Sequence, residues 1–150
     1  SIILVGPVRV SSEDSARGID ALRAKPNVHF VGRVPVEQVP YLVAACDVGL
    51  LPYRRNAWTR NIHPLKMYEY LACGLPAVST DIPGVHDEDD LIYIADDSQA
   101  FVSAIDRALG ENGKALIEKR QARASRNTWQ DRVECISELI EMTLQKKGSR

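Results

Sequence analysis

The chain has 150 residues and a formal net charge of −1; 45% of its residues are hydrophobic and 26% are charged, as is typical of one globular domain. This near-zero charge argues against nucleic acid or an anionic membrane as a general partner, and no apolar run reaches the roughly 18 residues of a membrane-spanning helix. The three cysteines have no paired or metal-like spacing. We therefore expect free, mostly buried thiols and a cytoplasmic location.

Short apolar runs alternate with helical patterns in the first third of the chain. We expect strands at residues 1–5, 28–31 and 48–52, and helices at residues 12–24 and 35–46. Ser11 or Ser12 should cap the first helix, because acidic residues follow directly. Pro40 must lie in the first turn of the second helix or break it. Since Ser1 already lies in an apolar run, we expect a fragment of a longer protein.

The rest of the chain predicts further strands and helices. The strands lie at residues 77–80 and 91–95. The helices lie at residues 64–73, from residue 98 to either Gly110 or Gly113, at 114–126 and at 129–145. Ser98 should cap the second of these helices, and the last should carry one apolar face before a frayed tail. The pattern indicates an α/β domain, a Rossmann-like parallel sheet of about five strands with helices on both faces and a helical C-terminus. Such sheets bind ligands at the carboxyl ends of their strands.

Residues 52–81 hold the least ordinary chemistry of the chain. Residues 48–68 carry four cations and no acid, whereas residues 81–97 carry seven acids and no Lys or Arg, which favours a small anionic ligand over a long polyanion. With Pro64 as the first helical residue, Leu65 and Lys66 would offer backbone N–H groups at the positive end of the helix dipole. A diphosphate suits such a site. The Glu69 carboxylate could then accept hydrogen bonds from a ribose diol.

Plainer interpretations of the same residues remain open. Lys66 and Glu69 could form an ordinary i,i+3 ion pair, and the arginines of the loop could simply be solvated. Trp58 could be a core residue, a stacking platform or an exposed loop residue, and of these we expect packing. His63 has the position of a structural helix N-cap. Residues 87–90 form an acidic run that we expect to be a solvated loop and not a metal site. From these residues alone, the sequence predicts an α/β domain with an anion site and no particular reaction.

One segment resembles a known family. HPLKMYEYLACGLPAVSTD is similar to the Pro-x-Lys-x-x-Glu-Tyr-Leu-Ala-x-Gly-x-Pro-Val-Val-Ser segment of GT-B glycosyltransferases, especially the retaining group 1, or family four, enzymes. NVHFVGRV, PVEQVPYLVAACDVGLLPY and TWQDRVECISELI resemble further segments of that family, in the same order. The resemblance implies the C-terminal, donor-binding half of a two-domain hexosyltransferase. We would expect residues 1–150 to lack the N-terminal acceptor domain and the first strand, and to be inactive alone.

The same resemblance implies roles for individual residues. Glu69 matches the glutamate that contacts the donor ribose. Lys66 matches the motif lysine, which is expected near the phosphates, and the backbone amides of Leu65 and Lys66 would also face the phosphates. The loops that frame the base and line the nucleotide pocket contribute four more positions: Gly32, Arg33, Pro52 and Tyr53. The donor would be a UDP- or GDP-linked sugar, bound without a metal or other cofactor. The missing domain would bring the acceptor, a sugar or lipid-linked sugar of polysaccharide biosynthesis, with peripheral membrane association possible and no nucleic acid partner.

Two donor-site positions depart from the family pattern. Asn61 stands where the family has a glutamate near the transferred sugar, and His63 stands where serine is common. No residue is assigned as catalytic. The alternatives are a nucleotide-sugar 2-epimerase of the same fold and a degenerate, non-catalytic α/β binding domain. A receiver-like module is disfavoured, because Gly6-Pro7 and Pro52 occupy the positions where receivers carry acids.

Overall fold

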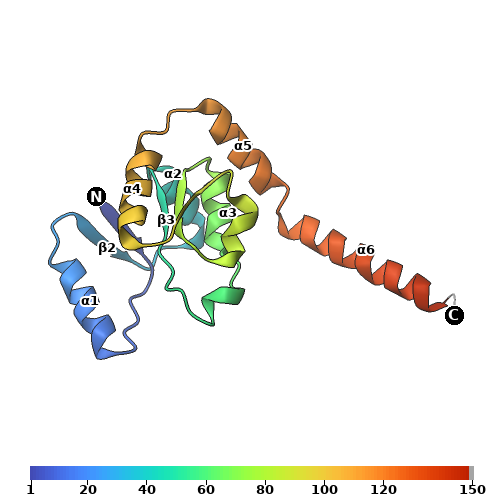
Figure 1. Cartoon of the computed structure of the whole chain (residues 1–150), viewed down its shortest axis with the longest axis horizontal. Coiled ribbons are helices and arrows are strands. Elements are labelled where there is room, and N and C mark those ends of the chain that lie inside the picture. The colour runs from blue at the N-terminus through green and yellow to red at the C-terminus, as the bar shows by residue number, and fades with distance from the viewer. Residues whose placement is uncertain (149–150) are drawn as a thin grey trace. The chain divides into compact units, whose positions relative to one another are not determined.

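The structure, a computed structural model, describes residues 1–148 and divides the chain into two compact units, Ser1–Tyr41 and Leu42–Arg150 (Figure 1). Within the described residues, five strands form two sheets, one in each unit, and every pairing is parallel. The predicted parallel α/β fold with a helical C-terminus is therefore confirmed. The strands are divided between two sheets, where the sequence pattern indicated one.

The first unit is a β-α-β arrangement. Strands β1 (Ile2–Val5) and β2 (Val28–Gly32) pair in parallel, and helix α1 (Glu13–Arg23) connects them. The Ser12 hydroxyl accepts a hydrogen bond from the Ser15 N–H at 3.2 Å and caps α1, as the sequence predicts. The strands and helix predicted in this unit are thus confirmed within one or two residues at each end.

The helix predicted at residues 35–46 is broken. A 3₁₀ turn, η1 (Val36–Gln38), leads into α2, a helix of six residues (Val39–Ala44), with Pro40 in its first turn. Proline has no N–H to donate to the preceding turn. A continuous α-helix through Pro40 would therefore lose one backbone hydrogen bond, and the proline ring would clash with the carbonyl group one turn earlier. The structure accommodates Pro40 by restarting the helix one residue before it.

The second unit contains a three-stranded parallel sheet. The strand order is β3-β4-β5, with strands Gly49–Leu51, Ala77–Thr80 and Tyr93–Ala95. Helix α3 (Leu65–Ala72) connects β3 to β4, and α4 (Ser98–Leu109) follows β5. Because α3 leads into the start of β4, its own first turn lies toward the carboxyl ends of the strands.

The two helices cover opposite faces of this sheet. Successive side chains of a strand point to opposite faces. Ala77 packs in one buried cluster with Met67 and Leu71 of α3, whereas Val78 packs in another with Ala104 of α4. This alternation confirms helices on both faces of the sheet and leaves its carboxyl edge to the loops.

The C-terminal helices differ in detail from the prediction. The carboxylate of Asp97, and not Ser98, caps α4 by accepting the Ala100 N–H at 2.8 Å. Helix α5 (Lys114–Ser125) follows, and α6 runs as Trp129–Gly148, past the predicted end. The predicted apolar face of α6 is exposed at Val133, Ile136, Leu139, Ile140 and Leu144. The remainder of the predicted frayed tail, residues 149–150, lies outside the described residues. No helix among residues 1–148 is long and apolar enough to cross a bilayer.

Candidate functional site

The basic loop between β3 and α3 takes its shape from two polar side chains. Thr59 is only 3% exposed, and its hydroxyl donates to the Arg54 carbonyl at 2.6 Å. The Asn56 side-chain oxygen accepts the N–H groups of Trp58 and Thr59 at 2.9 and 3.0 Å. A 3₁₀ turn, η2 (Thr59–Asn61), follows. The pair Asn-x-x-Thr, an Asx-turn signal, could have been found in the sequence.

The arginines of this loop are exposed, whereas the packing predicted for Trp58 is wrong. Arg54, Arg55 and Arg60 are all exposed, as the solvated interpretation requires. Trp58 is 71% exposed, whereas its neighbour Thr59 is buried. The loop therefore presents three guanidinium groups and an indole ring to solvent.

The carboxyl edge of the sheet fixes both ends of the loop. The Thr80 hydroxyl, at the end of β4, donates to the Tyr53 carbonyl at 2.8 Å. At the other end, the 3₁₀ segment η3 (Pro83–Glu88) packs so closely that a Cβ on Gly84 would lie 2.0 Å from the Ile62 carbonyl oxygen. Tyr53 is consequently half-buried, and the backbone leading into α3 is held in place.

The start of α3 differs by one residue from the prediction. Pro64, buried, is the N-cap with φ −72° and ψ 104°, and Leu65 is the first helical residue. The expectation that Pro64 is the first helical residue and His63 the N-cap is therefore wrong. The N–H groups of Leu65 and Lys66 have no partner within the helix, since a first turn leaves its donors open. No acidic side chain lies in this turn, so its positive end is not neutralised by a capping carboxylate.

Lys66 and Glu69 are paired on the exposed side of α3. The Lys66 ammonium lies 2.6 Å from a Glu69 carboxylate oxygen, and the two side chains are 52% and 44% exposed. The ordinary i,i+3 ion pair left open by the sequence is thus formed. Such an exposed pair contributes only a few tenths of a kcal/mol to stability, so a ligand could replace it at little cost in free energy.

The acidic run is not a solvated loop throughout. The Glu88 side chain is 3% exposed and pairs with the Arg123 guanidinium of α5 at 2.7 Å. Burial raises the pKa of Glu88, and Arg123 opposes that rise. Asp90 pairs with Lys119 at 2.5 Å, and the hydrogen bond from Lys119 holds the pKa of that carboxyl below its usual range. These partners lie about thirty residues further along the chain, so local spacing could not have revealed them.

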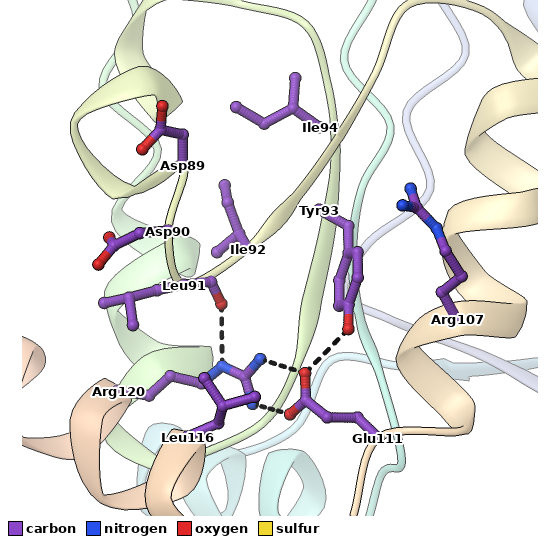
Figure 2. A pocket seen from close by; sticks show the side chains of 10 residues that line it. All are labelled: Asp89, Asp90, Leu91, Ile92, Tyr93, Ile94, Arg107, Glu111, Leu116 and Arg120. Carbon is purple, nitrogen blue, oxygen red and sulfur yellow. Dashed lines mark hydrogen bonds and ion pairs between the residues drawn. The ribbon is translucent and has the colours of Figure 1, made fainter. Parts of the chain in front are cut away.

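A pocket of about 350 Å³ is lined by none of the predicted donor-site residues. Its wall includes the start of β5 and the end of α4, which places it toward the amino ends of the strands (Figure 2). Arg120, 1% exposed, donates to both oxygens of Glu111 and, at 2.9 Å, to the Leu91 carbonyl. The Tyr93 hydroxyl also donates to Glu111, at 3.0 Å.

These contacts lower the pKa of Glu111, chiefly through the Arg120 hydrogen bonds, and both of its carboxylate oxygens accept hydrogen bonds. This cluster was not predicted from the sequence. We interpret it as a structural clamp between the β5 region and α5.

The thiols and the candidate metal ligands are dispersed. Cys46 and Cys73 are partly buried and Cys135 is exposed, so the expectation of mostly buried thiols is wrong for Cys135. All three are free. Among residues 1–148, no three His, Cys, Asp or Glu side chains come together as a metal site would need.

The family is decided by a match over residues 1–111 to the model of "Glycosyl transferases group 1". The chain belongs to the group 1 glycosyltransferases. A curated relative, TuaH of Bacillus subtilis (strain 168), which is assigned to teichuronic acid biosynthesis as a glycosyltransferase, is 27% identical over 130 residues. The match covers 84% of this chain and 32% of TuaH.

Solved structures share the fold. Crystal structures of Anabaena Alr3699/HepE in complex with UDP and with UDP-glucose match with TM-scores of 0.69 and 0.63 and sequence identities of 24% and 23%. Each match covers 96% of this chain and 40% of the other. The chain therefore spans about a third of TuaH and two fifths of HepE.

The group 1 domain divides the predicted donor residues between its two units. Gly32, with a positive φ of 77°, and Arg33, exposed, belong to the first unit. The second unit brings together the remaining positions on the loop after β3 and the start of α3: Pro52, Tyr53, Asn61, His63, Leu65, Lys66 and Glu69. Asn61 is exposed at the end of η2.

Proposed function

We propose that this chain is the donor-binding part of a group 1 glycosyltransferase and binds a nucleoside diphosphate sugar at the start of α3. The observation that carries the proposal is the first turn of α3, where the open N–H groups of Leu65 and Lys66 adjoin the exposed Lys66–Glu69 pair. Family membership supports it. The HepE structures, which contain UDP and UDP-glucose, name the ligands to try first.

The ion pair suits a ligand that carries both a diphosphate and a ribose. A diphosphate at the helix start is stabilised by the dipole and the N–H groups and attracts the Lys66 ammonium. Glu69, released from Lys66, then accepts hydrogen bonds from the two ribose hydroxyls. One ligand thus replaces the charge pair with contacts to both partners, at a cost of a few tenths of a kcal/mol for breaking the exposed pair.

The remaining positions complete the proposed donor site. Asn61 would contact the sugar through its neutral amide, and Pro52 and Tyr53 would line the nucleotide pocket. No metal or cofactor is required, and the departing diphosphate would be stabilised by the helix start and its cations.

The N-terminal domain of the longer enzyme would bind the acceptor, a sugar or lipid-linked sugar of polysaccharide biosynthesis. We expect that enzyme to work in the cytoplasm or at the cytoplasmic face of the membrane.

Calorimetric titration of the chain with UDP and GDP tests the proposal. Glu69→Ala and Lys66→Ala should each weaken nucleotide binding at least about tenfold, since a hydrogen bond to a charged group contributes about 1.5–3 kcal/mol. The matched control is the exposed Lys114–Glu118 pair of α5, 3.7 Å apart, where Glu118→Ala should leave binding unchanged. Equal effects of Glu69→Ala and Glu118→Ala would contradict the proposed site.

A non-catalytic nucleotide-binding domain is the second candidate. Asn61 favours it, because an amide cannot supply the negative charge that the family's glutamate brings near the transferred sugar. Product analysis on the longer protein with UDP-glucose and an acceptor extract separates the two. Glycosylated product supports the transferase, and nucleotide binding without product supports the second candidate.

A further inference from the structure

A chain of polar contacts leads from the start of α3 into the protein. His63 Nε2 lies 3.1 Å from the Tyr68 hydroxyl oxygen, and that oxygen lies 3.3 Å from a carboxylate oxygen of Glu88. The other Glu88 oxygen accepts from Arg123 at 2.7 Å. His63 is exposed, whereas the Glu88 side chain is only 3% exposed. We call these four residues the His63 relay. None of the roles proposed for the donor site involves Tyr68, Glu88 or Arg123.

The chemistry of the relay sets the direction of its hydrogen bonds. The Glu88 carboxylate, ionised against Arg123, can only accept, so the single Tyr68 proton is donated to it. The Tyr68 oxygen is then available only as an acceptor for His63. His63 must therefore donate from Nε2, so Nε2 carries a proton whether the imidazole is neutral or charged. In the neutral imidazole, Nδ1 is then the unprotonated nitrogen.

Charged groups surround the relay on three elements. They are Asp87, Glu88 and Asp90 of η3 and its C-terminal flank, Arg123 of α5 and Arg132 of α6. The Arg132 guanidinium lies over the Tyr68 ring at 5.8 Å from its centroid. Burial raises the pKa of Tyr68, and the adjacent Glu88 raises it further, so the hydroxyl keeps its proton near neutral pH. The relay therefore keeps one orientation as long as Glu88 is ionised against Arg123.

His63 Nδ1 is left without a partner among the described residues. His63 directly precedes the N-cap Pro64, so its imidazole belongs to the same end of α3 as the open N–H groups. A neutral Nδ1 offers a lone pair, which an anion does not favour, whereas a protonated Nδ1 donates a hydrogen bond and adds a positive charge. An anionic ligand at this helix start should consequently favour the imidazolium form.

We propose that Glu88, acting through Tyr68, is a positioning residue that keeps a proton on His63 Nε2 and reserves Nδ1 to take up a proton when a nucleoside diphosphate binds at the start of α3. The second half rests on the proposed function. His63 thereby becomes a phosphate-binding residue whose contact is made only in its charged form. In the longer enzyme, the same Nδ1 proton would be available to the departing diphosphate.

The first experiment requires no ligand. Nitrogen-15 NMR of the imidazoles in the whole chain should show neutral His63 as the Nε2–H tautomer, and Tyr68→Phe, which keeps the ring, should shift its two nitrogen resonances toward tautomer averaging. Tyr41→Phe, at a 79% exposed tyrosine, is the matched control and should change nothing at His63. His63 resonances that are the same in Tyr68→Phe and in the unaltered chain would overturn the positioning role.

The second experiment follows protons during binding. Titration with UDP near pH 7.5, in buffers of different ionisation enthalpy, should show uptake approaching one proton per UDP, since histidine is the side chain that changes charge in this range. His63→Gln should abolish the uptake and weaken binding several-fold. UDP binding without proton uptake would overturn the second half of the proposal. If neither UDP nor GDP binds, the proposed function fails while the NMR result still decides the role of Glu88 and Tyr68.

Discussion

Replacing Arg120 with methionine should destabilise the protein more than any other single substitution in the structural clamp between the β5 region and α5. Arg120 is 1% exposed and the Glu111 side chain 9%, so methionine leaves a carboxylate buried without its cation. The Leu91 carbonyl also loses the guanidinium donor, which lies at 2.9 Å. Removing one partner of a buried ion pair costs about 3–5 kcal/mol in free energy of unfolding. Lys114→Met, at a pair exposed by 89% and 65%, is the control and should cost under about 0.5 kcal/mol.

The pH dependence of this loss identifies its origin. Arg120 lowers the pKa of Glu111 below its unfolded value, so the pair stabilises the fold above that value and loses this stabilisation as pH falls through the folded pKa. Urea unfolding followed by circular dichroism should therefore show a gap between Arg120→Met and the unaltered chain that narrows from pH 7 toward acid. A cost below about 1 kcal/mol, or a gap that does not change with pH, would refute the ion-pair reasoning.

Three further predictions concern the proposed donor site and the thiols. Gly84→Ala should weaken UDP binding, because its Cβ would lie 2.0 Å from the Ile62 carbonyl oxygen and displace the loop; Gly110→Ala, where the nearest atom is 3.6 Å away, should leave binding unchanged in the same calorimetric assay. UDP affinity measured with EDTA should equal that measured with Mg²⁺, and a large loss in EDTA would contradict a metal-free site. Ellman's reagent should react first with exposed Cys135, since burial raises the pKa of Cys73; faster labelling of Cys73 would contradict this order.

Local signals in the sequence predicted the elements well. Ser12 caps α1, the strand at residues 77–80 is confirmed to the residue, and Gly110 follows the end of α4. Each of these features depends on residues only a few positions away in the sequence, because helix capping, strand alternation and helix termination are local effects. The start of α3 was predicted within one residue for the same reason, and with it the Lys66–Glu69 spacing.

Features that depend on distant partners could not be predicted in this way. Glu88 is buried because Tyr68 and Arg123, 20 and 35 residues away, satisfy its oxygens. Arg120 reaches Gly74, 46 residues away. An acidic run and a charged helix look solvated until the fold supplies their counterparts.

Exposure also depends on more than periodicity. The apolar positions of α6 lie on one face as predicted, yet that face is exposed among the described residues. Trp58 shows the same limit, because a turn built on Asn56 and Thr59 directs its ring to solvent.

Amide chemical-shift mapping with UDP tests the central claim most directly. In the nitrogen-15-labelled chain, UDP should shift the backbone amides of Leu65 and Lys66 most, with those of the loop before α3. The pocket toward the amino ends of the strands provides the contrast, with Arg107 and Glu111 in its wall (Figure 2). Largest shifts at Arg107 and Glu111, with Leu65 and Lys66 unmoved, would contradict a donor site at the start of α3.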